Sequence, residues 1–388
     1  MAFSERTPRD LSHNRITNAL DVLQTGSYID LTESNPTQCG FNYPADLLKK
    51  LNRSEGLVYQ SDPLGNLRAR EAVASYLASK GQRVEPANIF LTASTSEAYS
   101  FIFKLLGNPG DSFLVPAPGY PLLDHLLRLE GLEALPYSLR VESNWPVDLP
   151  LPHQNLQTNT KGLIVVNPQN PTGCFLSLSD QKALLDLCRQ HQMAYLSDEV
   201  FSDFAYPGQG LAKNSSPAVL SFRLGGLSKS LGLPQLKLSW IILDGPKELL
   251  GECKERLELI ADTYLSVNTP VQLALGDLFK FAPDFQNQGL HRVMDNRAFL
   301  EQTLKGVPGV SIWPAQGGWY ALVEIQKATL SEERWVLNLL EKHKVLVQPG
   351  GFYDFPKGCF LVLSLLPKST DFEEGVRRIR ECLAQTKN

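Results

Sequence analysis

Residues 162–173 read GLIVVNPQNPTG, a run of small and apolar residues that passes directly into a turn rich in proline and asparagine. An apolar run without polar alternation is typical of a strand that is buried on both faces. The two Asn-Pro pairs and the final glycine then predict a rigid loop at the carboxyl end of this strand. This stretch favours an α/β sheet whose strand ends carry polar loops.

Strands and helices alternate on both sides of this stretch. We expect strands at 89–92, 113–115, 162–166, 194–197, 219–222 and 238–243. We expect helices between them at 96–106, 122–129 and 179–192. Such alternation predicts a mostly parallel sheet that is covered by helices on both faces. The corresponding large α/β domain is expected to span residues 51–265.

The C-terminal third of the chain has a different pattern. Short strands are expected near 310–313, 319–323, 345–347 and 360–364, with helices at 293–304, 332–341 and 372–383. This pattern predicts a smaller α+β domain over residues 266–388, and a helix at 248–263 is expected to connect the two domains. Residues 1–50 lack the alternating pattern and are expected to pack with the small domain.

Composition argues against several classes of function. The 388 residues carry a net charge of −4, which provides no overall attraction to nucleic acid or to an anionic membrane. No apolar run approaches the roughly 20 residues that span a bilayer, and the N-terminus lacks the apolar region of a secretory signal. The six cysteines show no metal-site or disulfide spacing. We therefore expect a cytoplasmic protein that binds a small molecule and no metal.

Four of the expected strands end in side chains that suit one kind of chemistry. Ligands of open α/β sheets bind where the carboxyl ends of the strands meet the following loops. These ends provide an anion cradle before a helix, an amide, a carboxylate and an amine. The residues are Ser94–Ser96, Asn170, Asp198 and Lys229. An aldehyde cofactor with a phosphate and a basic ring nitrogen needs this set of groups.

The ordered series Asn-Pro-x-Asn-Pro-Thr-Gly, Asp-Glu and Ser-Lys resembles the fold-type I enzymes that depend on pyridoxal 5′-phosphate (PLP). Among these it is similar to the class I/II aminotransferases of the aspartate aminotransferase type, from Leu31 to the C-terminus. The resemblance implies that Lys229 forms the Schiff base and moves the proton, that Asp198 pairs with the pyridine nitrogen, and that Asn170 hydrogen-bonds the ring 3′-oxygen. It implies transfer of an amino group between an amine or amino acid and a keto acid or aldehyde.

The same resemblance implies roles for further residues. Tyr120 would stack on the cofactor ring as part of the catalytic group. Tyr59 would reach the phosphate bound by a neighbouring subunit, which implies a homodimer with shared active sites. Asn35 and Ser34 lie where the N-terminal segment of the family contacts the substrate. The implied phosphate ligands are Ser94, Thr95, Ser96, Ser228 and Lys237.

Three positions depart from the pattern of the family. Lys237 stands where an arginine usually binds the phosphate, so the charge is kept and the bidentate fork is lost. Phe201 stands where a tyrosine hydroxyl usually reaches the ring oxygen. Val362 stands where an arginine usually grips the substrate α-carboxylate. Binding of the carboxylate by this arginine fixes which bond of the substrate carbon is broken. The loss of the arginine therefore leaves the reaction type open.

Two interpretations of Val362 remain. Either the substrate amine carries no adjacent carboxylate, or another cation binds that carboxylate. The candidate cations are Arg15, Arg292 and Arg297, while Lys357 and Lys368 fit no strand position that faces the site. We favour a PLP-dependent aminotransferase. The alternatives are a PLP-dependent lyase or decarboxylase on the same fold and a non-catalytic PLP-binding relative.

Overall fold

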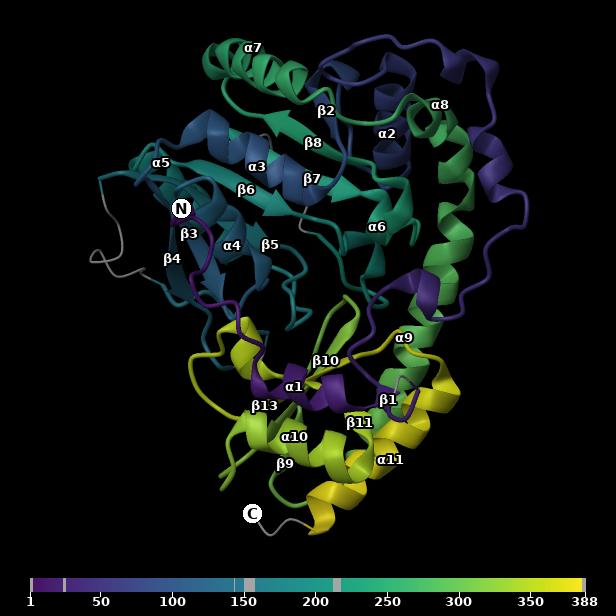
Figure 1. Cartoon of the computed structure of the whole chain (residues 1–388). Coiled ribbons are helices and arrows are strands. Elements are labelled where there is room, and N and C mark those ends of the chain that lie inside the picture. Colours follow the sequence, from purple (N-terminus) through teal and green to yellow (C-terminus); the bar gives the residue numbers. More distant parts are fainter. Residues whose placement is uncertain (1–2, 24–25, 143, 150–157, 212–217, 386–388) are drawn as a thin grey trace.

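A seven-stranded sheet forms the centre of the larger part of the molecule (Figure 1). The computed structural model describes residues 3–23, 26–142, 144–149, 158–211 and 218–385. The strands, in their order across the sheet, are β2 (Ile89–Thr92), β8 (Ser239–Asp244), β7 (Ser221–Gly226), β6 (Ala194–Asp198), β5 (Thr160–Val166), β3 (Ser112–Ala117) and β4 (Glu133–Ser138). β8 is antiparallel to both of its neighbours, and the other neighbouring pairs are parallel. The expected mostly parallel α/β sheet is therefore confirmed.

Helices cover both faces of this sheet because successive strand residues are apolar. Ile164 of β5 packs against the helices of one face, whereas Leu163 and Val165 pack on the other. The first face carries α3 (Thr95–Leu106), α4 (Leu122–Leu129) and α7 (Lys247–Tyr264). The second face carries α2 (Leu67–Ser79), α5 (Leu178–Gln190) and α8 (Thr269–Leu278). The continuous apolar run at 162–166 thus marks a strand that is buried on both sides.

The edge strand β4 was not expected from the sequence. Apart from the buried Tyr137, its residues are exposed or partly exposed, and it contains Pro136, which interrupts the apolar pattern of a strand. Proline is tolerated at a sheet edge, where a backbone N–H group is not needed for a second neighbour. The position of β4 beside β3, with no partner on its other side among the described strands, explains this composition.

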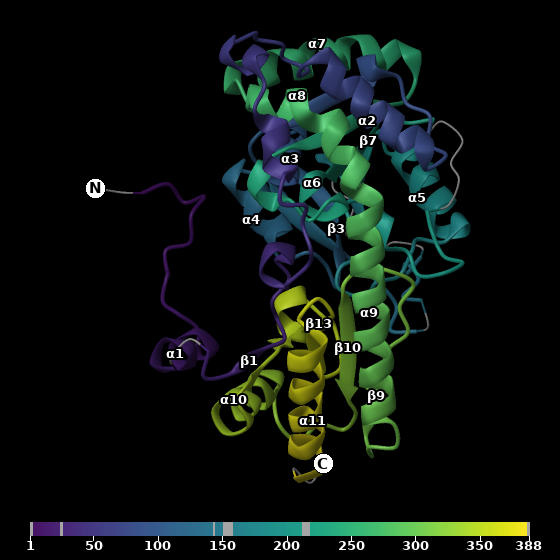
Figure 2. The ribbon, with the colours of Figure 1, turned by 90° about the vertical axis from the view of Figure 1, so that its right-hand side faces the viewer.

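A four-stranded antiparallel sheet forms the smaller part of the molecule, at the bottom of Figure 1. Its strands, in order, are β12 (Gln348–Pro349), β13 (Phe360–Ser364), β10 (Tyr320–Ile325) and β9 (Val310–Ile312). The helices α10 (Glu332–His343) and α11 (Ser369–Gln385) pack beside it. From the N-terminal segment, β1 (Ile29–Asp30) pairs with β11 (Val345–Leu346), and α1 (Arg15–Val22) contacts α10 (Figure 2).

The long helix α9 (Ala282–Leu304) joins the two parts of the molecule (Figure 2). It contacts α6 (Leu227–Ser230) at the large sheet and α11 in the smaller part. The expectation that the helix at 248–263 makes this connection is wrong, because α7 lies over the large sheet against α3. Only the second half of α9 was expected. Gly289 interrupts the helical pattern of its first half, and a Cβ at this position would come within 2.7 Å of the Phe204 ring.

Short helical turns link these elements. They are η1 (Pro36–Gln38), η2 (Leu47–Leu51), η3 (Ser54–Leu57), η4 (Pro86–Asn88), η6 (Ser202–Phe204), η7 (Pro234–Leu236), η8 (Phe279–Phe281) and η9 (Gly350–Tyr353). None of the helices in the described part of the chain has both the length and the apolar character that crossing a bilayer requires.

Candidate functional site

Three of the expected site residues come from neighbouring strand ends of the large sheet. Asn170 follows β5, Asp198 is the last residue of β6, and Lys229 lies in α6 directly after β7. β5, β6 and β7 are adjacent and parallel, so their carboxyl ends lie at one edge of the sheet. The sheet therefore places an amide, a carboxylate and an amine beside one another.

The amine of Lys229 lies against aromatic rings. Its Nζ is 4.8 Å from the centre of the Trp319 ring and 5.2 Å from that of the Phe201 ring. Burial lowers the pKa of Lys229 to about 8, although the Asp198 carboxylate and the Cys39 thiol act in the opposite direction. A large fraction of the amine is therefore neutral near pH 8, and the neutral amine is the nucleophilic form.

Asp198 is a buried carboxylate that is held by two donors. Its Oδ2 accepts a hydrogen bond of 3.0 Å from the Tyr99 hydroxyl, and its Oδ1 accepts one of 3.2 Å from the Val200 N–H group. Burial raises the pKa of Asp198 to about 6, while these two hydrogen bonds and the charge of Lys229 lower it. The group is thus ionised above pH 6 and can hold a protonated base.

Asn170 carries a polar atom that has no partner. The residue is 8% exposed, and its Oδ1 is buried without a hydrogen bond among the described residues. Buried polar groups are satisfied in most proteins, so this amide is suited to a bound molecule. The loop around it is fixed by Gly173, which adopts a φ of +71° and where a Cβ atom would lie 2.4 Å from the Gly317 carbonyl oxygen. The close approach of these two loops requires a glycine here.

The expected anion cradle lies at the start of α3. Ser94 is the N-cap residue, and its Oγ accepts a hydrogen bond of 3.1 Å from the Glu97 N–H group. The hydroxyl of Ser94 is therefore used within the helix cap. The N–H groups of Thr95 and Ser96 belong to the first turn, where no helical carbonyl is available to them. The helix start retains these donors for an anion.

Ser228 and Lys237 differ in their surroundings. Ser228 is half-buried and directly precedes Lys229 in α6. Lys237 is exposed and has a left-handed backbone with a φ of +50°. The chain thus places a lysine at the surface where the resemblance led us to expect a phosphate ligand.

Three tyrosine side chains, those of Tyr120, Tyr320 and Tyr353, lie near the residues described above. Burial raises the pKa of Tyr120 to about 12, and Asp198 and Tyr320 act in the same direction. The Tyr320 ring centre lies 6.4 Å from that of Tyr353 and 6.3 Å from that of Phe201. The Gly119 N–H group donates to the Tyr353 carbonyl oxygen at 2.9 Å, which links the loop before Tyr120 to the smaller part of the molecule.

Several of these residues were not expected from the sequence. Trp319 and Tyr320 follow the pair Gly317-Gly318, and this pattern at a strand start could have drawn attention to them. Tyr99 lies within α3 as an ordinary apolar-face residue, so no local signal distinguishes it. Its hydrogen bond to Asp198 becomes visible only when α3 is packed on the sheet.

The N-terminal segment lies beside Tyr320. Asn35 uses its Oδ1 to accept from the Thr37 N–H group at 3.1 Å, so this oxygen caps η1. The Ser34 hydroxyl is close enough to Tyr320 to lower the pKa of that tyrosine, which burial raises. Glu33 is half-buried, and its Oε1 accepts a hydrogen bond of 2.7 Å from the Asn35 N–H group. Glu33 was not among the expected site residues.

Val362 lies in an apolar environment. It is 1% exposed and belongs to a cluster that includes Leu322, Tyr353 and Phe360. In the antiparallel sheet it stands opposite Leu322 on one side and Gln348 on the other. Lys357 and Lys368 are both exposed. None of these neighbours in the described cluster supplies a positive charge at position 362.

The three arginines that were considered as replacements have other partners. Arg15 pairs with Glu333 at 3.1 Å. Arg297 pairs with Glu301 at 2.8 Å and donates to the Trp313 carbonyl oxygen at 2.8 Å. Arg292 donates to the carbonyl oxygens of Cys39 and Leu366 at 3.2 and 3.0 Å, and its guanidinium lies 5.2 Å from the Phe41 ring centre.

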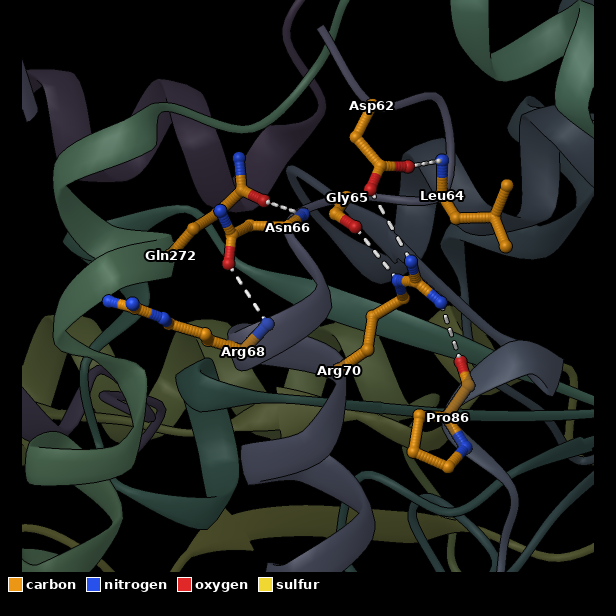
Figure 3. Close-up of polar contacts among 8 residues, drawn as sticks. All are labelled: Asp62, Leu64, Gly65, Asn66, Arg68, Arg70, Pro86 and Gln272. Atoms are coloured by element: carbon orange, nitrogen blue, oxygen red, sulfur yellow. Dashed lines mark hydrogen bonds and ion pairs between the residues drawn. The ribbon is translucent and has the colours of Figure 1, made fainter. Parts of the chain in front are cut away.

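Tyr59 is not in contact with the Lys229 group among the described residues, and its side chain is 69% exposed. The loop that follows it is held by the buried Arg70 (Figure 3). Arg70 donates to the Gly65 and Pro86 carbonyl oxygens at 2.8 and 3.0 Å and pairs with Asp62 at 3.3 Å. Tyr59 therefore precedes a well-anchored loop and projects from it.

The whole arrangement has counterparts in known proteins. Residues 27–378 match the model of the family described as aminotransferase class I and II. The chain is 28% identical to the glutamate-pyruvate aminotransferase AlaA of Haemophilus influenzae over 381 residues, which cover 94% of this chain and 93% of that protein. It is 29% identical to an alanine aminotransferase of Mycobacterium tuberculosis over 366 residues, covering 90% and 84% of the two chains.

Solved structures share the same fold. An alanine aminotransferase from Pyrococcus furiosus superimposes with a TM-score of 0.84 at 24% identity, covering 92% of this chain and 93% of that one. A tyrosine aminotransferase from Leishmania infantum superimposes with a TM-score of 0.85 at 22% identity, covering 98% and 100%. Both extend over nearly the complete architecture described above.

Proposed function

Because the chain belongs to the class I and II aminotransferases and transfers amino groups, we propose that it does so with PLP held by Lys229, Asp198 and Asn170. The observation that carries this proposal is the convergence of the three side chains at the adjacent ends of β5, β6 and β7. The unpartnered Oδ1 of Asn170 and the lowered pKa of the Lys229 amine fit an aldehyde cofactor with a ring hydroxyl.

The bound cofactor supplies an electron-accepting ring that weakens the bonds of the amine-bearing carbon of the substrate. Lys229 would hold the cofactor through Nζ. Its amine would also act as the general base and general acid that removes a proton from the amine-bearing carbon of the substrate and gives it back. A lysine whose pKa lies near 8 is suited to both directions of this transfer at neutral pH.

Asp198 keeps a proton on the ring nitrogen. Its carboxylate is ionised above pH 6 and lies in a buried place, where its attraction for a positive charge is strong. Tyr99 and the Val200 N–H group fix the orientation of both oxygens. We propose that Tyr120 stacks on the ring and that Asn170 hydrogen-bonds the ring oxygen. Phe201 offers the ring an apolar surface, where the tyrosine that is usual in the family would offer a polar contact to the ring oxygen.

The phosphate is proposed to bind at the start of α3. Thr95 and Ser96 offer first-turn N–H groups there, and the helix dipole favours a negative charge. Ser94 and Ser228 add hydroxyls, and Lys237 adds charge from the surface without the planar fork of an arginine. Asn35 and Ser34 are proposed to contact the substrate.

A homodimer with shared active sites is proposed from an exposed apolar surface. Leu57 is 90% exposed, Val58 58%, Tyr59 69% and Leu265 64%. Tyr59 and Leu265 line one hollow, so these side chains lie close together. Exposed apolar surfaces of this kind mark interaction sites, and the resemblance to the family implies that Tyr59 would reach the phosphate of the neighbouring subunit in a dimer. Replacing Leu57 and Leu265 by aspartate should then convert a dimer to a monomer in light scattering, and an unchanged mass would contradict this assembly.

We also propose the location and the domain limits. All six cysteines are free and buried, which suits a reducing compartment such as the cytoplasm. We propose that the chain divides into three parts, with the first segment packing on the last. The parts are residues 1–50, 51–265 and 266–388.

The test is reconstitution with PLP followed by addition of an amine donor. The protein-bound cofactor should absorb in the visible range, and the donor should convert it to the pyridoxamine form with release of one carbonyl product. Lys182→Ala, an exposed position on α5, should behave as wild type. Release of carbon dioxide or of an eliminated group in place of the carbonyl product would contradict amino-group transfer.

A further inference from the structure

A network of polar side chains contacts α6, the short helix that carries Lys229. The helix consists of four residues, Leu227–Ser230, and a helix of this length is not stable through its own hydrogen bonds. The Ser230 Oγ donates to the Gly226 carbonyl oxygen at 3.0 Å, which ties the end of the helix to its start. The position of α6 in the molecule therefore depends on contacts from other elements.

Gln286 of α9 makes one such contact with the backbone of α6. Its Nε2 donates to the carbonyl oxygen of Ser230, the residue next to Lys229, at 3.0 Å. Gln286 is 9% exposed, although other buried positions of α9, such as Phe285 and Val293, are apolar. A buried amide costs free energy unless its polar atoms are bonded, so a glutamine at this position indicates a role beyond filling space.

Both polar atoms of the Gln286 amide have partners. Nε2 also donates to the Tyr76 hydroxyl at 2.8 Å, and Oε1 accepts from Lys80 Nζ at 2.7 Å. The Tyr76 hydroxyl donates to Asp203 Oδ2 at 2.6 Å, and Lys80 Nζ pairs with Asp203 Oδ1 at 3.2 Å. Because an ammonium group can only donate, Lys80 binds the oxygen end of the amide and leaves the nitrogen end to face Ser230.

Aromatic packing holds the Tyr76 end of this network. The Tyr76 ring centre lies 4.3 Å from that of Phe279, with the two planes 9° apart, and 6.4 Å from that of Trp240 in β8. The Tyr76 side chain is 8% exposed, so its hydroxyl is fixed by a packed ring. Gln286 thus receives its orientation from residues of α2 and passes it to α6.

The same helix is connected to the aromatic ring beside the Lys229 amine. In the second half of α9, Nδ2 of Asn296 donates to the Leu365 carbonyl oxygen at 2.9 Å. The Leu365 N–H group donates to the Trp319 carbonyl oxygen at 2.7 Å, and the Trp319 ring centre lies 4.8 Å from Lys229 Nζ. Side chains of α9 therefore bind both the helix that carries the lysine and the segment that carries this ring.

We propose that Gln286 is a positioning residue for Lys229, because its hydrogen bond to the Ser230 carbonyl oxygen sets where the lysine amine lies. This inference rests on the proposed function and extends it to a residue that acts through α6. The amine has to reach both the cofactor and the reacting carbon of the substrate, so a small displacement of α6 slows both steps. Without the bond from Gln286, α6 occupies additional positions, and only the fraction in the observed position is competent.

The experiment compares two glutamines of α9. Gln286→Leu removes the bonds to Ser230 and Tyr76, whereas Gln288→Leu removes two bonds from the same helix to the backbone of Asn42, at 2.9 and 3.1 Å. PLP is added to each cofactor-free protein, and the absorbance of the bound cofactor gives the rate of attachment. Attachment should be about 10-fold slower than in wild type for Gln286→Leu and unchanged for Gln288→Leu, since the loss of a buried hydrogen bond lowers the competent fraction by about this factor.

Two further readouts separate positioning from a general loss of stability. The PLP-loaded proteins react with L-alanine and with L-glutamate, and for the faster of the two Gln286→Leu should lower kcat by about 10-fold while KM changes by less than about twofold. Tyr76→Phe keeps the bond between Gln286 and Ser230, so it should slow attachment less than Gln286→Leu does. Urea unfolding of each variant shows that the protein is folded under the conditions of the assay.

Gln286→Glu replaces Gln286→Leu if the latter does not fold. The glutamate variant keeps the size of the side chain and an acceptor for Lys80, and it offers no donor to Ser230. Attachment as fast as in wild type, equal slowing in the variants of Gln286 and Gln288, or a raised KM with an unchanged kcat would overturn the inference and leave the proposed function standing. Attachment of PLP to a residue other than Lys229 in the wild type would overturn both.

Discussion

Asn170, Asp198 and Lys229 come from neighbouring strand ends of one sheet, whereas Ser34, Asn35 and Tyr320 come from an N-terminal segment and a strand far apart in the sequence. The first group, the cofactor-facing side, depends on parallel strands whose ends must lie together. The second group, which we propose faces the substrate, depends on how the smaller part of the molecule and the N-terminal segment meet. The first group therefore follows from local patterns along one sheet, and the second follows only from tertiary packing.

The largest effect is expected at the cofactor-facing side, for Lys229→Ala. This variant lacks both the covalent attachment and the proton carrier, so kcat/KM should fall by about 10³- to 10⁴-fold or more. Steady-state kinetics with the best donor measure the change, with Lys182→Ala as the matched control. A loss of less than tenfold would show that another group performs the proton transfer.

Asp198→Asn should have the next largest effect. The amide keeps the shape of the side chain and cannot hold a positive charge, so we expect a loss of about 10²- to 10³-fold in kcat. Asp186→Asn removes an exposed carboxylate that pairs with Arg189, and surface pairs of this kind contribute little. If both variants lose activity equally, the role assigned to the buried carboxylate is wrong.

The pH dependence of cofactor attachment tests the amine of Lys229. Its pKa is lowered to about 8, so the rate of attachment to cofactor-free protein should rise by about tenfold per pH unit below 8 and level off above it. Between pH 8 and 10.5 the unfolded chain binds more protons at this lysine than the folded chain does, so the free energy of unfolding should increase with pH in that window. In Lys229→Met this increase should be absent. If the increase persists, a group other than Lys229 causes it.

Tyr99→Phe should have a smaller effect. The variant removes one of the two hydrogen bonds to Asp198 and keeps the buried ring, so the pKa of the carboxyl should rise further and the acid limb of the pH–rate profile should move upward. We expect a loss of about 10-fold in kcat near neutral pH, since a hydrogen bond to a charged group contributes about 1.5–3 kcal/mol. An unshifted acid limb would mean that Tyr99 only fills space.

The smallest effect on the reaction is expected for Val362→Ala. This side chain packs among Leu322, Tyr353 and Phe360, so its truncation should lower the free energy of unfolding by about 2 kcal/mol. The absorbance of the bound cofactor and the order of preference among amine donors should be retained. A changed order of preference would show that Val362 takes part in substrate recognition.

The contrast between the two sides also explains what could be predicted from the sequence. The residues around Asn170, Asp198 and Lys229 form local patterns at strand ends, and the sequence predicted both the parallel sheet and the meeting of these loops. Trp319 and Tyr99 contact Lys229 and Asp198 through tertiary packing, and no spacing in the sequence indicates these contacts. The connecting helix was misplaced for a related reason, because α7 and α9 have similar helical patterns and differ in the surfaces they cover.

The most direct test of the central claim is to locate the cofactor on the chain. The PLP-loaded protein is reduced with borohydride, digested, and analysed by mass spectrometry. We predict that the added mass is on the peptide that contains Lys229, with Lys237 unmodified. Modification of another lysine, or of none, in a protein whose bound cofactor is visible by absorbance would contradict the assignment of this site.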